Sequence, residues 1–129
     1  LLSSIMSSDF NEEAEILSVV IQSGELLAIR LNEDLKMENA PEFFEGFQQA
    51  LEDTHSTVVV DFSRIRFVDS SGVGILLKCA HSIRNRGGRF RILGLSRALL
   101  SVFKLAGLLK IFEVMENEQA QKEYPALFE

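Results

Sequence analysis

Two adjacent serines, Ser70 and Ser71, stand between an aspartate and a glycine, Asp69 and Gly72. A serine hydroxyl can accept a phosphoryl group, which adds roughly −1.5 to −2 charges at pH 7. The four residues follow an apolar stretch and precede a helical pattern, so we expect them at a helix N-terminus. Free N–H groups and the helix dipole favour an anion there. Because Asp or Ser before a helix is also an ordinary N-cap, the tetrapeptide alone does not establish a function.

The sequence gives little support for catalysis at these serines or at a metal site. The sequence has no G-x-x-x-x-G-K phosphate loop and no G-x-S-x-G turn. The two histidines, His55 and His81, do not stand in positions typical of a catalytic triad, and His81 is expected roughly 16 Å from Ser70 along one helix. With a single cysteine, Cys79, a zinc site is improbable as well. We therefore expect no catalytic residue, metal or cofactor, with a small α/β enzyme as the less favoured alternative.

The composition is typical of one globular domain. Hydrophobic residues make up 47% of the 129 residues and charged residues 25%. No apolar run approaches the roughly 18 residues that cross a bilayer, and the N-terminus lacks the features of a signal peptide. A lone cysteine indicates a reducing compartment. We expect a cytoplasmic protein without membrane insertion.

Charge is distributed unevenly along the chain. Residues 64–110 hold ten of the thirteen basic side chains and one acid, Asp69, although the whole chain has a net charge of −6. A basic surface could bind an acidic protein, a nucleotide or a membrane headgroup. A block in the sequence need not be a patch in space, however, and no nucleic-acid recognition motif accompanies it. We expect no direct binding of nucleic acid.

Hydrophobic patterns predict the elements that position the serines. Strands are expected at 17–21, 26–31, 57–62, 89–93 and 111–114, and helices at about 40–51, 70–86, 97–106 and 119–124. Asn39 and Ser96 are the expected N-caps of the first and third helices. The first two strands should form a hairpin, and the strand–helix–strand repeats that follow imply parallel strands. The continuous β-branched run at 57–62 suggests a strand covered on both faces.

The region around the serines resembles a known family over much of the chain. The sequence Val-Val-Asp-Phe-Ser at 59–63, followed by Phe-Val-Asp-Ser-Ser-Gly-Val-Gly at 67–74, is similar to the STAS domain of bacterial anti-sigma factor antagonists (anti-anti-sigma factors). The glycine pair at 87–88 and the segment 101–108 are similar to later parts of that domain. The resemblance runs from about residue 17 to 115.

This resemblance implies an α/β fold of the STAS type. It would consist of a small mixed sheet, an N-terminal hairpin plus parallel βαβ units, with helices packed mainly on one side. We expect a lead at 1–15 that is either disordered or a non-native expression remnant, the STAS domain at 16–116 and a C-terminal helix or tail at 117–129.

The resemblance also implies a partner switch. The unphosphorylated protein would bind and sequester an anti-sigma factor that is a serine kinase of the GHKL type. Phosphorylation of Ser70 would release the kinase, and a PP2C-type phosphatase would reset the switch. Gly72 would permit close approach of the partner, and the outer face of the following helix would extend the surface. The expected partner-binding residues are Asp34, Asp69, Ser70, Ser71, Gly72, Gly74 and Lys78.

One position departs from the family pattern. Antagonists of this type usually carry Gly-x-Leu-Asp after the second strand, whereas residues 33–36 here read Glu-Asp-Leu-Lys. Lys36 thus stands where an aspartate is expected. Either neighbouring Asp34 contacts the partner, or the partner has a different charge pattern. The substitution leaves open an alternative function, a STAS subunit of a transporter or of a stress-signalling assembly with a non-kinase partner.

Overall fold

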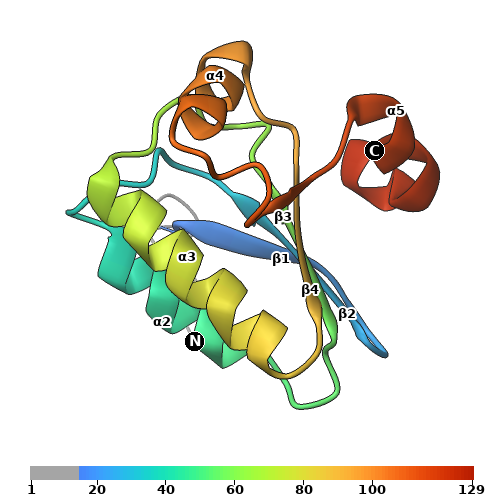
Figure 1. Ribbon diagram of the computed structural model, residues 1–129. Helices are drawn as coiled ribbons and strands as arrows, with labels where there is room; N and C mark the ends of the chain where they lie inside the picture. Colours follow the sequence, from blue (N-terminus) through green and yellow to red (C-terminus); the bar gives the residue numbers. More distant parts are fainter. Residues whose placement is uncertain (1–14) are drawn as a thin grey trace, which may run out of the picture.

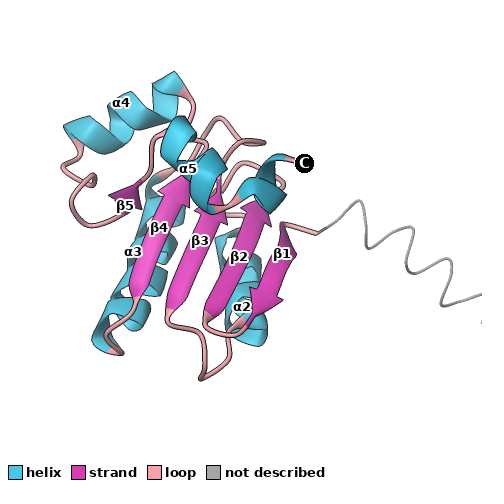
Figure 2. Ribbon diagram, turned by 90° about the vertical axis from the view of Figure 1, so that its right-hand side faces the viewer, coloured by secondary structure: helices cyan, strands magenta, loops and turns pink. Residues whose placement is uncertain are grey.

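The structure is a computed structural model that describes residues 15–129, so all but the last residue of the lead expected at 1–15 lies outside the described part. Its centre is a five-stranded sheet, which Figure 1 shows nearly edge-on. The strands follow one another in chain order, as Figure 2 shows. The first two strands form an antiparallel hairpin, and every later pairing is parallel. The mixed sheet predicted from the sequence is confirmed. The strands are β1 (Leu17–Ser23), β2 (Leu26–Leu31), β3 (Thr57–Asp61), β4 (Arg89–Leu93) and β5 (Glu113–Val114).

Helices cover both faces of the sheet unequally. Figure 2 shows α2 and α3 behind the strands and the shorter α5 and η1 in front of them. The arrangement, with helices mainly on one side, agrees with the prediction. In the described residues no helix is long and apolar enough to cross a membrane. The helices are α2 (Ala40–Ala50), α3 (Ser70–Asn85), α4 (Arg97–Leu105), α5 (Asn117–Glu123) and the 3-10 helix η1 (Pro125–Phe128).

Strand β3 is buried on both faces, as its β-branched run predicts. Val58 and Val60 face the larger hydrophobic core, beneath α2 and α3. Val59 faces a smaller cluster on the opposite side, which contains Ala120 of α5 and Leu127 of η1. Because β3 is held by two cores, the loop that leaves its end starts from a fixed point.

One local prediction, the capping of α2 by the side chain of Asn39, needs correction. Asn39 does not cap α2: its side chain bonds backwards, accepting from the N–H of Lys36 at 2.8 Å and donating to the carbonyl of Asp34 at 2.8 Å. In α4, Leu99 and Phe103 are buried, whereas Leu105 is 89% exposed. At roughly 100° per residue, Leu105 lies about 200° around the helix from Phe103.

The Ser96 cap is confirmed, since its Oγ accepts from the N–H of Leu99 at 3.1 Å.

The basic residues of segment 64–110 do not form one free patch. Arg86 donates to the carbonyl oxygens of Glu52 and His55. Arg89 and Arg91 both pair with Glu113 across the β4–β5 edge, and Arg91 is buried. These three arginines of the cationic block are therefore used within the fold.

Candidate functional site

The candidate serine lies where two loops, far apart in the sequence, run side by side. One loop follows β2 and the other connects β3 to α3. Leu35 and Val68 form an isolated parallel bridge between them. On either side of this bridge the N–H of Leu35 donates to the carbonyl of Phe67 at 3.2 Å, and the N–H of Asp69 donates to the carbonyl of Leu35 at 3.0 Å. The start of α3 is thereby attached to the loop after β2.

Asp69 is the N-cap of α3, as its position before the helix predicts. One carboxylate oxygen accepts from the N–H of Gly72 at 2.9 Å, and the other accepts from the N–H of Met37 at 2.9 Å. These two bonds hold the pKa of the Asp69 carboxyl below its usual value, and the N–H of Ser71 and the charge of Lys36 act in the same direction. The residue before the candidate serine is thus a stable anion at neutral pH.

Asp34, in the loop after β2, accepts hydrogen bonds from the loop that leads to α3. Its Oδ1 accepts from the backbone N–H groups of Arg66 at 2.9 Å and Phe67 at 3.2 Å. The sequence predicts that Asp34 contacts a partner; in the structure its side chain accepts hydrogen bonds within the protein. Two aspartates, Asp34 and Asp69, therefore cross-link the loops by accepting hydrogen bonds from each other's segments.

The interpretation of Gly72 needs correction. We expected its missing side chain to admit a partner, but Gly72 is buried. A Cβ at this position would lie 2.6 Å from the carbonyl oxygen of Leu35 and 2.7 Å from Cγ1 of Val68. The close approach that glycine permits is made by the chain's own loop.

The remaining predicted residues follow the outer side of α3. Ser70, Gly74 and Lys78 are exposed and Ser71 is half-buried. Within residues 15–129 the Ser70 hydroxyl has no hydrogen-bond partner, and a side chain added at Gly74 would meet open space. Lys78 lies over the ring of Phe44 in α2, 4.4 Å from its centroid, so this cation is positioned by the neighbouring helix.

Two exposed apolar residues in the joined loops are not indicated by the sequence patterns. Met37 is 67% exposed and Phe67 is 51% exposed, and both belong to the loops that Asp69 and Asp34 join. Each of the two joined loops therefore contributes one exposed apolar side chain near the start of α3. The sequence does not distinguish Met37 and Phe67 from Leu35 and Val68, the buried apolar residues of the same loops, because burial there depends on the bridge between the loops.

Fold and site together define a small α/β domain with an exposed serine at the start of a capped helix. A model of the STAS domain family matches residues 18–121. The chain belongs to this family.

Similar proteins carry related names. The anti-sigma-B factor antagonist of Listeria monocytogenes is 30% identical over 59 residues, which cover 46% of this chain and 52% of that protein. The chain thus matches about half the length of this curated relative. The anti-sigma factor antagonist SpoIIAA in its unphosphorylated form has a TM-score of 0.68 at 25% identity, covering 83% of this chain and 94% of that chain. The phosphorylated form of SpoIIAA from Bacillus has a TM-score of 0.64 at 25% identity, with 83% and 97% covered.

Proposed function

We propose that this protein is an anti-sigma factor antagonist that switches partners when Ser70 is phosphorylated. Unphosphorylated, it binds and sequesters an anti-sigma factor that is also a serine kinase of the GHKL type. Phosphorylation of Ser70 releases that partner, and a PP2C-type phosphatase restores binding. The observation that carries the proposal is an exposed Ser70 at the start of α3, beside the fixed carboxylate of Asp69.

The surroundings of Ser70 suit docking of a protein. The rigid loop pair presents the exposed side chains of Met37 and Phe67, and the outer side of α3 continues the surface through Gly74. In such an interface, Met37 and Phe67 would be the apolar anchors, and the Ser70 hydroxyl would lie among charged side chains. The partner would cover Ser70 without having to reshape the loops, because the loops already hold each other.

The same geometry supports release on phosphorylation. A phosphate on Ser70 would add a dianion next to the Asp69 carboxylate, which is ionised at neutral pH. Burying two neighbouring negative charges in an interface costs about 3 kcal/mol or more, which weakens binding by roughly 100-fold. Local electrostatics can thus separate the partners, and no rearrangement of the fold is required.

Lys36 gives the proposed interface a particular charge. Its neighbour Met37 donates a backbone hydrogen bond to the Asp69 carboxylate, and the charge of Lys36 acts to lower the pKa of that carboxyl. Where family members usually carry an aspartate, this chain therefore presents a cation. We propose that the partner faces Lys36 with a carboxylate, and that the kinase differs in charge there from those that recognise an aspartate.

The direct test is phosphorylation by a GHKL-type kinase encoded beside the gene. After incubation with ATP, the intact mass of the wild-type protein should rise by one phosphate, Ser70→Ala should show no increase, and Ser71→Ala should behave as wild type. Binding of the kinase should be retained by Ser70→Ala and weakened at least tenfold by Ser70→Glu. A full phosphate gain in Ser70→Ala would contradict the assignment, and so would capture of a transporter in place of a kinase.

We further propose that the protein acts in the cytoplasm and catalyses no reaction. His55 is buried, and its Nδ1 accepts from the N–H of Glu52, so this ring nitrogen is occupied within the fold. His81 is exposed on α3, three turns beyond Ser70. Neither histidine is placed to activate the serine, which supports binding as the protein's activity.

A further inference from the structure

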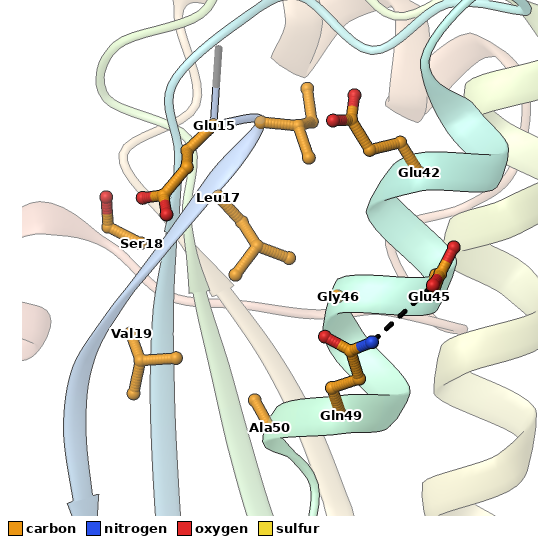
Figure 3. A pocket seen from close by; sticks show the side chains of 10 residues that line it. Glu15, Leu17, Ser18, Val19, Glu42, Glu45, Gly46, Gln49 and Ala50 are labelled. Atoms are coloured by element: carbon orange, nitrogen blue, oxygen red, sulfur yellow. Dashed lines mark hydrogen bonds between the residues drawn. The ribbon is translucent and has the colours of Figure 1, made fainter. Parts of the chain in front are cut away.

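A groove runs between the edge strand β1 and helix α2, on the flank of α2 opposite α3. Its volume is about 700 Å³. Figure 3 looks into it, with side chains from the strand on one side and from the helix on the other. No residue of the groove belongs to the Ser70 site. The lining residues are Glu15, Ile16, Leu17, Ser18, Val19, Glu42, Glu45, Gly46, Gln49 and Ala50.

The walls of the groove are held in place by packing and by hydrogen bonds. Leu17 packs against the helix at Gly46, where a Cβ would lie 3.1 Å from its Cδ2. A glycine in the middle of a helix costs roughly 0.5–1 kcal/mol relative to alanine, and close packing with the strand explains its presence. Beyond the groove, the Gln22 side chain donates to the Ala50 carbonyl at 2.8 Å and to the Glu52 carboxylate at 3.0 Å. Strand and helix are therefore fixed relative to each other.

The groove has an apolar floor and a rim of one charge. Leu17 and Ala50 contribute the apolar floor. Every charged residue that lines it is a glutamate, namely Glu15, Glu42 and Glu45, and all three are exposed. A ligand with apolar side chains and positive charges would be complementary to such a lining.

Strand β1 supplies a free edge next to this groove. It is the first strand of the sheet, and among residues 15–129 no strand pairs with its outer side. Val19, on this strand, is 44% exposed. The pairing of β1 with β2 shifts in register between Val19 and Ile21, so β1 is regular only before this irregularity. That regular part of the strand lines the groove. An edge strand beside a helix is a geometry in which extended peptides bind, adding a strand while alternate side chains enter the groove.

We propose that this groove binds an extended segment of a partner protein in which apolar residues alternate with lysine or arginine. The chain's own residues 1–14 do not fit this description. They contain Asp9, Glu12 and Glu13 and no lysine or arginine, so their charge repeats that of the rim. The proposal concerns a different surface from Ser70 and does not depend on the proposed phosphorylation.

The test is a titration of the ¹⁵N-labelled full chain, followed by NMR. The probe is an acetylated and amidated hexapeptide of alternating valine and lysine, with two comparison peptides in which glutamate replaces lysine or serine replaces valine. The valine–lysine peptide should shift the amide signals of residues 15–19 and 42–50. Both comparison peptides should bind at least tenfold more weakly, because one loses the charge match and the other the apolar contact.

A variant that lacks two rim carboxylates tests whether the rim charge contributes to peptide binding. Glu42→Gln with Glu45→Gln should weaken binding of the valine–lysine peptide about tenfold, given roughly 0.7 kcal/mol for each ion pair. The matched control is Glu25→Gln with Asp53→Asn, which removes two exposed carboxylates outside the groove and should leave binding unchanged. Equal loss in both variants, equal binding of the valine–glutamate peptide, or absence of shifts at 15–19 and 42–50 would overturn the proposal.

Two other occupants would also overturn it. If the groove signals shift with protein concentration before peptide is added, a second copy of the chain binds there. If deletion of residues 1–13 moves the same signals without peptide, the chain's own N-terminal segment is the occupant.

Discussion

The carboxylate of Asp69 accepts a hydrogen bond from the backbone N–H of Met37 at 2.9 Å, across 32 residues of sequence. With its other oxygen the same side chain caps α3 at Gly72. One ionised group therefore both starts the helix that carries Ser70 and fixes the loop beside it. Its charge should be detectable in the stability of the whole domain.

We expect Asp69→Asn to be less stable than wild type at pH 7 and the difference to disappear in acid. The folded-state pKa of Asp69 lies below its unfolded value, so its ionised form stabilises the fold fully above the unfolded pKa. That contribution is lost as the pH falls through the folded pKa. Urea unfolding of both proteins between pH 7 and pH 2.5 measures the difference. A difference that stays constant over this range would show that the charge makes no contribution.

Gly72 and Gly74 form a matched pair within one turn of α3. Gly72→Ala should destabilise the domain by about 1–3 kcal/mol, because the new methyl group meets the Leu35 carbonyl and Val68. Gly74→Ala should stabilise it by about 0.5–1 kcal/mol, since that position faces open space in a helix. Chemical denaturation of both variants measures whether the free energy of unfolding falls or rises in each. A loss of stability in both would mean that helix propensity and space do not explain these glycines.

Asp61 forms a buried ion pair with Arg30, whose Nε lies 2.7 Å from Oδ2, and it also accepts from the N–H of Ser63 at 2.8 Å. The guanidinium of Arg30 also donates a hydrogen bond to the carbonyl of Leu127 in η1 at 2.7 Å. We expect Asp61→Asn to cost about 3 kcal/mol, because it leaves a largely buried guanidinium without its counter-ion. Asp53→Asn, at an exposed position, is the control and should change the free energy of unfolding by less than about 0.5 kcal/mol. Similar values for the two variants would contradict this assignment.

The thiol of Cys79 should be unreactive in the native protein. Burial raises its pKa to about 12, so very little thiolate exists at pH 8. Alkylation by iodoacetamide, followed by mass spectrometry, should proceed about a thousandfold more slowly in buffer than in 8 M urea. Comparable rates under the two conditions would show that α3 opens readily and would question its role as a fixed platform.

The arrangement of strands and helices could be predicted because each element carries its own periodic pattern. The β-branched run in β3 and the apolar spacing of α3 each indicate their element without knowledge of the rest. The position of Ser70 at the start of α3 follows from these patterns, and so does the cap at Asp69.

What could not be predicted are the contacts between loops. Asn39 has the residue type of a helix cap, yet its side chain bonds to Asp34 and Lys36, because the loop that it closes offers better partners. Gly72 can be interpreted as an opening for a partner only as long as the position of Leu35 is unknown. Such contacts depend on which distant loops meet, and local pattern contains no information on that.

The independence of Ser70 from the scaffold has a consequence for how the protein can evolve. The loops are joined by backbone groups and by two aspartates, and in the described residues nothing in this joint uses the serine hydroxyl. A single codon change at position 70 could abolish, imitate or restore a modifiable group, and no compensating change would be needed elsewhere. Lineages could therefore gain or lose regulation at this position while the domain itself stays intact.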